Sequence, residues 1–290
     1  MRTRWVARRA LRKQLRIVVD IRWRLGDEIM AIPIYEGIKR RHPFCHLTVW
    51  CNHSDLLLRN PHVDQTLGPE QKPSLAECDR FISLREAPRG VFRLDHYASL
   101  AGIHTPPMNP RLYYDDWSVP QLVSVGMTTK QFIAVNNGGT WETKRWPQQN
   151  WQALCDALTH AAYEVAQLGR GDARIANAAD LTGKTSVHDA ACALRHARLL
   201  ISSDSGLMHL ALAVGTPVLA LFGPTIPAML VRTNTPLTAL TNERDCQGCW
   251  NRPSVKMTEG VCPLCISPCM GTISVETVLA RAYKLLDDGL

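Results

Sequence analysis

Residues 202–225 read SSDSGLMHLALAVGTPVLALFGPT, and this stretch decides the fold. An apolar run predicts a strand that ends at Ser202, a short helix at 206–214 and another strand at 217–222. Strands that alternate with helices indicate a parallel sheet with helices on both faces. Ligands of such sheets bind at the carboxyl ends of the strands, so the polar turns after these two strands are candidate binding sites.

The same alternation occurs on both sides of a stretch rich in proline and aromatic residues at 106–120. Expected strands lie at 15–21, 46–51, 63–67, 80–84, 132–136 and 163–168, and expected helices at 27–41, 148–160 and 187–196. We therefore predict an α/β fold of two Rossmann-like, doubly wound domains that face a cleft. The predicted domains are 17–125 and 126–290, preceded by a basic arm at 1–16.

The composition is that of a globular protein. The chain has 290 residues, of which 46% are hydrophobic and 20% charged, and no apolar run approaches the ~18 residues that cross a bilayer. The first residues, MRTRWVARRALRKQLR, lack the apolar segment of a signal peptide. These features lead us to expect a cytoplasmic protein.

The net charge of +7 is concentrated in the arm, which holds seven of the 33 basic residues and no acidic one. Without the arm, 26 basic residues balance 26 acidic ones, so the body is neutral. Wound as a helix, the arm is basic on one side and apolar on the other, which suits peripheral contact with an anionic membrane. A solvated terminal extension is the alternative, and nucleic-acid binding is not expected because no further basic stripe follows.

The turn at Asp204, Ser205 and Gly206 has the features of a phosphate site. It joins a strand to the start of a helix, where backbone N–H groups and the helix dipole favour an anion. His209 lies on the first turn of that helix, and Asp204 could accept hydrogen bonds from sugar hydroxyls. The structural alternative is that Asp204 or Ser205 is a simple N-cap.

Two further loops are expected at the same sheet edge. Gly223-Pro224-Thr225 forms a tight turn after the next strand, which is a weak signal alone. The loop 137–147 offers glycines and the Thr140 hydroxyl, and Lys144 or Arg145 can neutralise a pyrophosphate. An exposed basic loop is the alternative for this segment.

In the first half, the loop 22–26 leads from a strand to a helix and places Asp27 at or near the helix start. A carboxylate that faces the cleft there could act as a general base on an acceptor hydroxyl. Glu28 is the second candidate for this role, and an N-cap role for Asp27 is the structural alternative.

Half of the ten cysteines fall between 246 and 269. Two Cys-x2-Cys pairs in one short segment indicate a tetrahedral thiolate site for zinc or a single iron, and five thiols compete for four positions. The candidates are Cys246, Cys249, Cys262, Cys265 and Cys269. A fully ligated ion has no open coordination position, so we predict a structural metal and no catalytic one.

The segments RWRLGDEIMAIPIYEGIKRRHP, NNGGTWETKRWP, DLTGKTS and SSDSGLMHLALAVGTPVLALFGPT closely resemble glycosyltransferase family 9, the ADP-heptose:lipopolysaccharide heptosyltransferase group. The resemblance implies a GT-B fold, an ADP-sugar donor bound by the second domain, and inverting transfer to a glycan without a catalytic metal. The chain is shorter than the family pattern between Leu67 and Tyr113, in the half that shapes the acceptor site.

The resemblance also implies roles for individual residues. Asp27 takes the position of the catalytic base, and the remaining matched positions hold the donor. Those positions are Thr140, Lys144, Ser186, Asp204, Ser205, Gly206, His209, Gly223 and Thr225. Asp172 is a loose match for a ribose ligand. The fourth metal ligand can be either of two cysteines. Family members often end their cysteine set in Cys-Met, which favours Cys269 of Cys269-Met270, whereas the spacing of the cysteines alone favours Cys265.

Three other functions stay open from the sequence. A protein O-heptosyltransferase would use the same donor on a protein acceptor, and iron-bearing heptosyltransferases of that kind are similar in their cysteine content. A sugar-nucleotide epimerase or hydrolase of GT-B fold would need no acceptor. A zinc-ribbon nucleic-acid-binding protein would bind with strong salt dependence, which the neutral body disfavours.

Overall fold

The computed structural model describes residues 14–85, 88–104, 109–118, 120, 122, 125–127, 132–170, 173–232, 234–241, 244–252, 254–255, 258, 260–262 and 269–288. Most of the basic arm, Asp172 and Cys265 lie outside these residues. No helix in the described part of the chain is long and apolar enough to cross a membrane.

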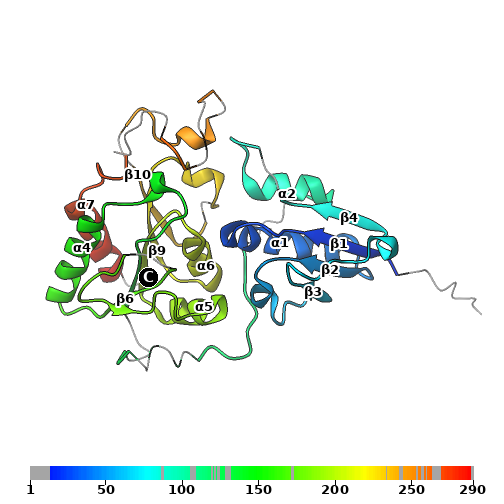
Figure 1. The fold of residues 1–290 in the computed structure, drawn as a ribbon, viewed down its shortest axis with the longest axis horizontal. Helices are drawn as coiled ribbons and strands as arrows, with labels where there is room; N and C mark the ends of the chain where they lie inside the picture. Colours follow the sequence, from blue (N-terminus) through cyan, green and yellow to red (C-terminus); the bar gives the residue numbers. More distant parts are fainter. Residues whose placement is uncertain are drawn as a thin grey trace, which may run out of the picture.

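The first sheet has four parallel strands in the order β3-β2-β1-β4 (Figure 1). Its strands are β1 (Arg16–Asp20), β2 (His46–Trp50), β3 (Gln65–Leu67) and β4 (Arg80–Ser83). Two helices accompany it, α1 (Leu25–Arg41) and α2 (Arg93–Ala101). Helix α1 contacts α2, and it is buried along most of its first three turns because it also packs against the second half of the chain.

The second sheet has six parallel strands in the order β10-β9-β8-β5-β6-β7. Its strands are β5 (Ile133–Asn136), β6 (Val165–Gln167), β7 (Ala179–Asp180), β8 (Leu199–Ser203), β9 (Val218–Phe222) and β10 (Leu237–Thr241). Its helices are α4 (Gln148–His160), α5 (Val187–His196), α6 (Gly206–Val214) and α7 (Val275–Asp287). Two parallel sheets with helices between strands confirm the predicted α/β class.

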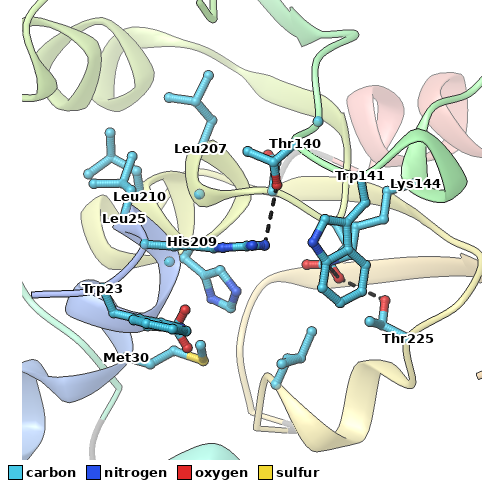
Figure 2. A pocket seen from close by; sticks show the side chains of 18 of the residues that line it. Trp23, Leu25, Met30, Thr140, Trp141, Lys144, Leu207, His209, Leu210 and Thr225 are labelled. Carbon is cyan, nitrogen blue, oxygen red and sulfur yellow. Dashed lines mark hydrogen bonds and ion pairs between the residues drawn. The ribbon is translucent and has the colours of Figure 1, made fainter. Parts of the chain in front are cut away.

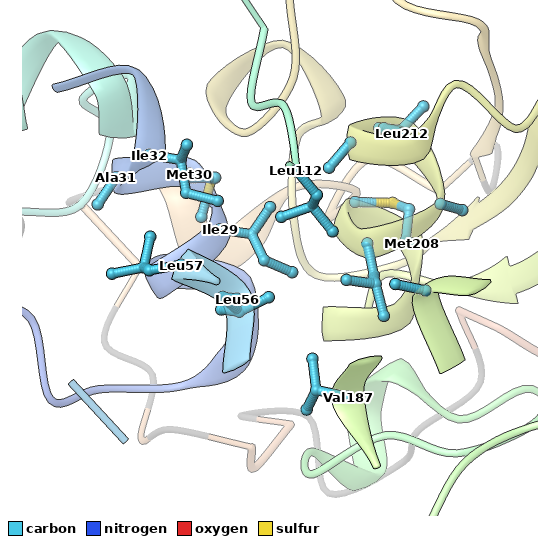
Figure 3. Packing of buried hydrophobic residues seen from close by; sticks show 14 of the residues in the cluster. Ile29, Met30, Ala31, Ile32, Leu56, Leu57, Leu112, Val187, Met208 and Leu212 are labelled. Atoms are coloured by element: carbon cyan, nitrogen blue, oxygen red, sulfur yellow. The ribbon is translucent and has the colours of Figure 1, made fainter. Parts of the chain in front are cut away.

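One hydrophobic core joins the two sheets. Ile29 and Met30 of α1 face Met208 and Leu212 of α6, with Leu112 of the connecting segment between them (Figure 3). All of these side chains are buried. A large apolar contact between domains opposes their separation, so the α1–α6 contact is a fixed junction on one side of the cleft.

Close approach of α1 and α6 requires small residues at their N-termini. A Cβ at Gly26 would lie 2.9 Å from His209 Cδ2, and a Cβ at Gly206 would lie 3.0 Å from Leu25 Cβ. Helix α6 then ends at Gly215, whose φ of 84° is in the left-handed region that glycine favours. The glycines thus bring the two helix starts together at the mouth of the cleft.

Candidate active site

A cavity of about 770 Å³ lies where the loops after the strands of both sheets meet. Asp27 and all but one of the predicted donor residues line it, namely Thr140, Lys144, Ser186, Asp204, Ser205, Gly206, His209 and Thr225. Figure 2 shows Trp23, Leu25 and Met30 on one side of this space, Thr140, Trp141 and Lys144 on the other, and His209 between them. The size suits a sugar nucleotide rather than a macromolecule.

Basic residues outnumber acidic ones around the cavity. Among the described lining residues the only carboxylates are Asp27 and Asp204. The cationic side chains are those of Arg24, Arg85, Arg89, Arg93, Lys144, Arg145 and Arg170. Such an excess attracts an anionic ligand such as a diphosphate.

The start of α6 forms one wall of the cavity. Ser205 is the N-cap of this helix, and its hydroxyl accepts a hydrogen bond from Met208 N at 3.4 Å. The predicted N-cap role of Ser205 is therefore confirmed, and it is compatible with ligand binding because Ser205, Gly206 and Leu207 also line the cavity. The positive end of the α6 dipole thus points at the space where a phosphate would lie.

Asp204 is buried at the tip of β8 and is held by two partners. Its Oδ2 atom lies 2.6 Å from Lys144 Nζ and accepts a hydrogen bond from Thr225 Oγ1 at 2.7 Å. Burial works to raise the pKa of Asp204, but the positive charge of Lys144, with help from His209 and Thr225, lowers it overall. Asp204 is therefore an anion, and Lys144 ties the loop 137–147, called the donor loop below, to β8.

His209 is neutral in this site. Burial, followed by the repulsion of Lys144 and Arg93, lowers the pKa of His209 to about 4, although Asp204 acts in the opposite direction. The imidazole packs against Gly26 at the start of α1. A neutral ring at this junction can exchange hydrogen bonds with a ligand without adding charge.

Asp27 is the third residue of α1 and is not its N-cap, a position that Arg24 takes. Tyr97 donates a hydrogen bond from its hydroxyl to Asp27 Oδ1 at 3.3 Å, and Arg93 Nε lies 3.3 Å from the same atom. Burial raises the pKa of Asp27, although Arg93, Tyr97, Arg24 and Lys144 stabilise its anion. A raised pKa in a cavity is typical of a general base.

Arg93 and Tyr97 were missing from the sequence-based set of site residues. Both come from α2, a helix that the pattern analysis did not identify, and its position against α1 could not be read from local sequence. Tyr97 is 1% exposed and fits the apolar side of α2, so its hydroxyl is the only unusual signal.

Glu28, the second candidate for the base, does not line the cavity. Its carboxylate accepts hydrogen bonds from Asn52 N at 2.7 Å and His53 N at 3.0 Å, and it lies 2.9 Å from His53 Nδ1. The side chain is 2% exposed. Glu28 therefore fixes the loop after β2, and of the two carboxylates only Asp27 lines the cavity.

Gly223 and Ser186 have different surroundings. Gly223 does not line the cavity; a Cβ there would lie 2.8 Å from Met270 Sδ and 3.0 Å from Cys269 Sγ. It allows the cysteine-rich segment to pack closely behind the donor wall. Ser186 lines the cavity and caps α5 through a reciprocal pair of hydrogen bonds with Asp189.

Four of the five clustered cysteines are described, namely Cys246, Cys249, Cys262 and Cys269. Burial raises the pKa of the Cys269 thiol, and Cys246, Cys249 and Cys262 raise it further. Cys249 N donates a hydrogen bond to Cys246 O at 3.0 Å, which closes a turn between the first pair. No three His, Cys, Asp or Glu side chains within the described ranges are grouped so that they could hold a metal ion.

The cysteine-rich segment packs against the donor side of the cavity. Trp250 N and Gly248 N donate hydrogen bonds to Pro224 O and Gly223 O, at 2.8 and 3.0 Å. The Asn251 side chain accepts a hydrogen bond from Ile226 N at 2.7 Å. Trp250 and Asn251 line the cavity as a result, and neither was predicted as a site residue.

Two parallel α/β domains with a polar cavity between their strand ends define the GT-B class of fold. The family described as glycosyltransferase family 9 (heptosyltransferase) matches residues 93–258, which is more than half of the chain. The chain therefore belongs to glycosyltransferase family 9. The expected family is confirmed.

Relatives and solved structures agree with this assignment. Lipopolysaccharide heptosyltransferase 1 of Pseudomonas aeruginosa is 31% identical over 193 residues, which are 59% of this chain and 53% of that protein. The chain thus spans about half the length of this relative. The match with lipooligosaccharide heptosyltransferase 2 of Haemophilus influenzae is shorter, at 33% identity over 29% of this chain and 28% of that protein.

Likeness in fold extends over nearly the whole chain. A family 9 glycosyl transferase from Veillonella parvula has a TM-score of 0.75 at 20% identity, covering 94% of this chain and 97% of that one. The iron-containing dodecameric heptosyltransferase TibC, from enterotoxigenic E. coli, was solved in complex with ADP-D-beta-D-heptose. It has a TM-score of 0.79 at 20% identity, covering 96% of this chain and 78% of that one.

Proposed function

We propose that the protein transfers a heptose, or a similar sugar, from an ADP-activated donor to a hydroxyl of a lipopolysaccharide-type glycan. The observation that carries this proposal is the position of Asp27. It faces the same cavity as Lys144, Asp204 and the start of α6, and it comes from the other domain. Family membership and the ADP-heptose complex of the similar TibC structure support the choice of donor.

In the proposed reaction, Asp27 takes the proton of the acceptor hydroxyl. The hydroxyl oxygen then attacks the anomeric carbon, a new C–O bond forms, and the bond between that carbon and the β-phosphate oxygen breaks. The electron pair of the broken bond leaves with ADP. Lys144 and the N-terminus of α6 stabilise the departing diphosphate, and Asp204 accepts hydrogen bonds from sugar hydroxyls.

The cavity separates these roles. Asp27 and Arg93 belong to the first half of the chain, whereas Thr140, Lys144 and Thr225 belong to the second. We assign Thr140 and Lys144 to the diphosphate, and Ser186 to the region beside the nucleoside. Gly223 does not line the cavity; we assign it an indirect role, in which the absence of a side chain lets Met270 pack against the turn before Thr225.

The donor is tested by thermal shift and product analysis with ADP-heptose, GDP-sugars and UDP-sugars. We expect only the ADP-sugar to stabilise the protein, and we expect ADP release to require a lipopolysaccharide-core acceptor. Engagement of UDP-sugars alone would refute the proposed donor. Conversion of ADP-heptose without an acceptor would instead indicate an epimerase or a hydrolase.

The base is tested with Asp27→Asn. Loss of a general base is expected to lower kcat about 10²- to 10⁴-fold, whereas ADP-heptose should still raise the melting temperature because Asp27 lies on the acceptor side. Asp287→Asn is the matched control, since Asp287 is an exposed aspartate of α7 that does not line the cavity. Unchanged transfer by the Asp27 variant would show that another group takes the proton.

A structural metal is part of the proposal. The thiol set is the soft, all-sulfur type that binds zinc or iron, and the turn closed by the hydrogen bond from Cys249 N to Cys246 O is compatible with a Cys-x2-Cys ligand pair. Cys246, Cys249 and Cys262 with Cys269 or Cys265 would hold the ion. The ion would cross-link the cysteine-rich segment and so fix the position of Trp250.

Elemental analysis of the purified protein and of the single variants Cys265→Ser and Cys269→Ser tests this site. We expect about one zinc or iron per chain, retained in one variant and lost in the other. A metal-free protein with an unchanged melting temperature in the presence of a chelator would contradict a structural metal.

A further inference from the structure

The cleft is bridged on its open side by a contact between the two halves of the chain. Arg89 lies in the loop between β4 and α2, and its Nη1 atom donates a hydrogen bond to Val255 O at 2.9 Å. Its guanidinium also lies 4.1 Å from the centre of the Trp250 ring. In Figure 1, the segment after β4 and the segment after β10 lie near each other.

The contact continues from Trp250 into the donor loop. The Trp250 and Trp141 rings meet edge to face, with centroids 4.6 Å apart and an interplanar angle of 67°. Two cations lie over the Trp141 ring. Lys144 Nζ is 4.3 Å from the centre of the ring, and the Arg24 guanidinium carbon is 5.6 Å from it. Arg24 Nη1 is also 3.5 Å from Thr140 Oγ1. Two tryptophans of the second half are thus held between two arginines of the first half.

Trp141 is enclosed on the remaining side. It is 7% exposed, and Gly260 of the cysteine-rich segment lies close to its ring. The donor loop therefore depends on that segment for its packing. Lys144, which pairs with Asp204, follows Trp141 by three residues and shares this environment.

The position of this bridge makes it a device for closing the cleft. The α1–α6 core, with Ile29 and Met208, fixes the two halves on one side, and the nearby hydrogen bond from His188 N to Asp55 Oδ2 belongs to that side. Cation–π contacts and single hydrogen bonds are weak enough to open and re-form. A fixed junction combined with a weak, reversible bridge permits hinge motion.

We propose that Arg89 and Trp250 form a latch that holds the donor loop in its binding position and keeps the cleft closed over the sugar nucleotide. They are positioning residues, because they act through Trp141 and Lys144. The inference rests on the proposed sugar transfer for its role in the reaction. Its structural content, that Arg89 orders a loop of the other domain, is independent of the substrate.

The test is hydrogen–deuterium exchange of the full-length protein without ligand, comparing wild type with Arg89→Ala. We expect faster amide exchange in peptides that cover 137–145 and 244–252, although the substitution lies in the other domain. Arg40→Ala is the matched control, since Arg40 is an exposed arginine of the same domain that pairs with Glu36. Faster exchange confined to peptides around residue 89 would overturn the latch.

Milder variants separate the latch from simple misfolding. Arg89→Lys keeps the charge but loses the planar guanidinium, and Trp250→Phe keeps an aromatic ring, so both are expected to fold and to show smaller increases in exchange. The increase in amide exchange at 137–145 in the Arg89→Lys/Trp250→Phe double variant should differ from the sum of the increases in the two single variants. Additive effects would show that Arg89 and Trp250 act separately and would refute their coupling.

Kinetics then link the latch to the reaction. We expect Arg89→Ala to lower kcat/KM for ADP-heptose about tenfold, as loss of one cation–π contact and one hydrogen bond would do. If wild-type protein transfers no sugar from ADP-heptose while the exchange pattern is as expected, the proposed function fails and the latch stands. If transfer is normal in the variant, the latch has no part in the reaction.

Discussion

At the residue scale, the two carboxylates of the cavity are both buried but have opposite pKa shifts. Lys144 lies 2.6 Å from Asp204 and lowers its pKa, whereas burial outweighs the more distant Arg93 at Asp27 and raises its pKa. Different environments for two acids in one site separate a permanent anion from a proton acceptor. This difference underlies the assignment of Asp204 to the sugar and Asp27 to the hydroxyl.

Tyr97 is expected to set the pH range of the reaction. Its hydroxyl donates to the Asp27 anion, so Tyr97→Phe should raise the pKa of Asp27 further. Because the base must be deprotonated, the acidic limb of the kcat profile should move to higher pH. The measurement is kcat against pH, with Tyr163→Phe as a control in the other domain. An acidic limb at its original pH would show that the hydrogen bond does not reach the base.

Lys144 and Asp204 should be coupled in stability. Lys144→Met leaves Asp204 buried without its cation, which typically costs 3–5 kcal/mol. The double variant with Asp204→Asn removes the orphaned charge, so it should recover part of the free energy of unfolding but not the binding of ADP. Urea unfolding and ADP titration measure the two effects. Equal stability of the single and double variants would contradict the coupling.

Most of the site residues predicted from the sequence line the cavity, because the turns after parallel strands meet at one edge for any fold of this class. Asp27 and Asp204 could be identified from their places next to such turns. Tyr97, Arg93 and Trp250 could not, since their roles depend on how α2 and the cysteine-rich segment pack in space. Glu28 shows the reverse case: it was the second candidate for the base, but its carboxylate is bonded to Asn52 and His53 of the loop after β2 and does not face the cavity.

At the element scale, the starts of α1 and α6 lie as close as their side chains allow. Gly206→Ala would place a Cβ 3.0 Å from Leu25, an overpacking that typically costs 1–3 kcal/mol and would push the helix starts apart. Donor affinity should fall with it, because the α6 N-terminus would move. Thermal unfolding and ADP titration report the two losses.

A second substitution tests whether the clash is the cause. Leu25→Ala removes Cγ and Cδ2, two of the three Leu25 atoms that a Cβ at Gly206 would meet. The loss of stability caused by Gly206→Ala should therefore be smaller in the Leu25→Ala background than in the wild type. No recovery would indicate that residue 206 needs glycine for another reason, such as space for the phosphate.

The alternation of strands and helices was predictable wherever apolar periodicity is strong. The expected helix at 206–214 and the observed α6 agree, and α1 begins two residues before the expected position. Four of the helices and strands described above were missed, namely α2, β7, β10 and α7. Strand β10 is an edge strand with mostly half-exposed residues, so it lacks the continuous apolar run that marks the central strands.

At the scale of the whole molecule, the shared core predicts one cooperative unfolding transition. Met208 of α6 is fully buried against residues of α1, so Met208→Ala should cost about 2–5 kcal/mol and destabilise both halves together. Differential scanning calorimetry should show a single peak at lower temperature. Phe44→Ala is the control, because Phe44 is 88% exposed. Two separated peaks would show that the halves unfold independently.

The same shared core restricts how relatives of this protein can be recombined. A chimera that joins the first half of one transferase to the second half of another would mismatch Ile29 and Met30 with a foreign α6. A crossover that exchanges α1 together with α6, while leaving the acceptor loops in place, preserves the junction. Under the proposed function, in which the first half binds the acceptor, acceptor preference should be altered by grafting the loops after β1 and β4, which line the cavity, rather than by exchanging halves.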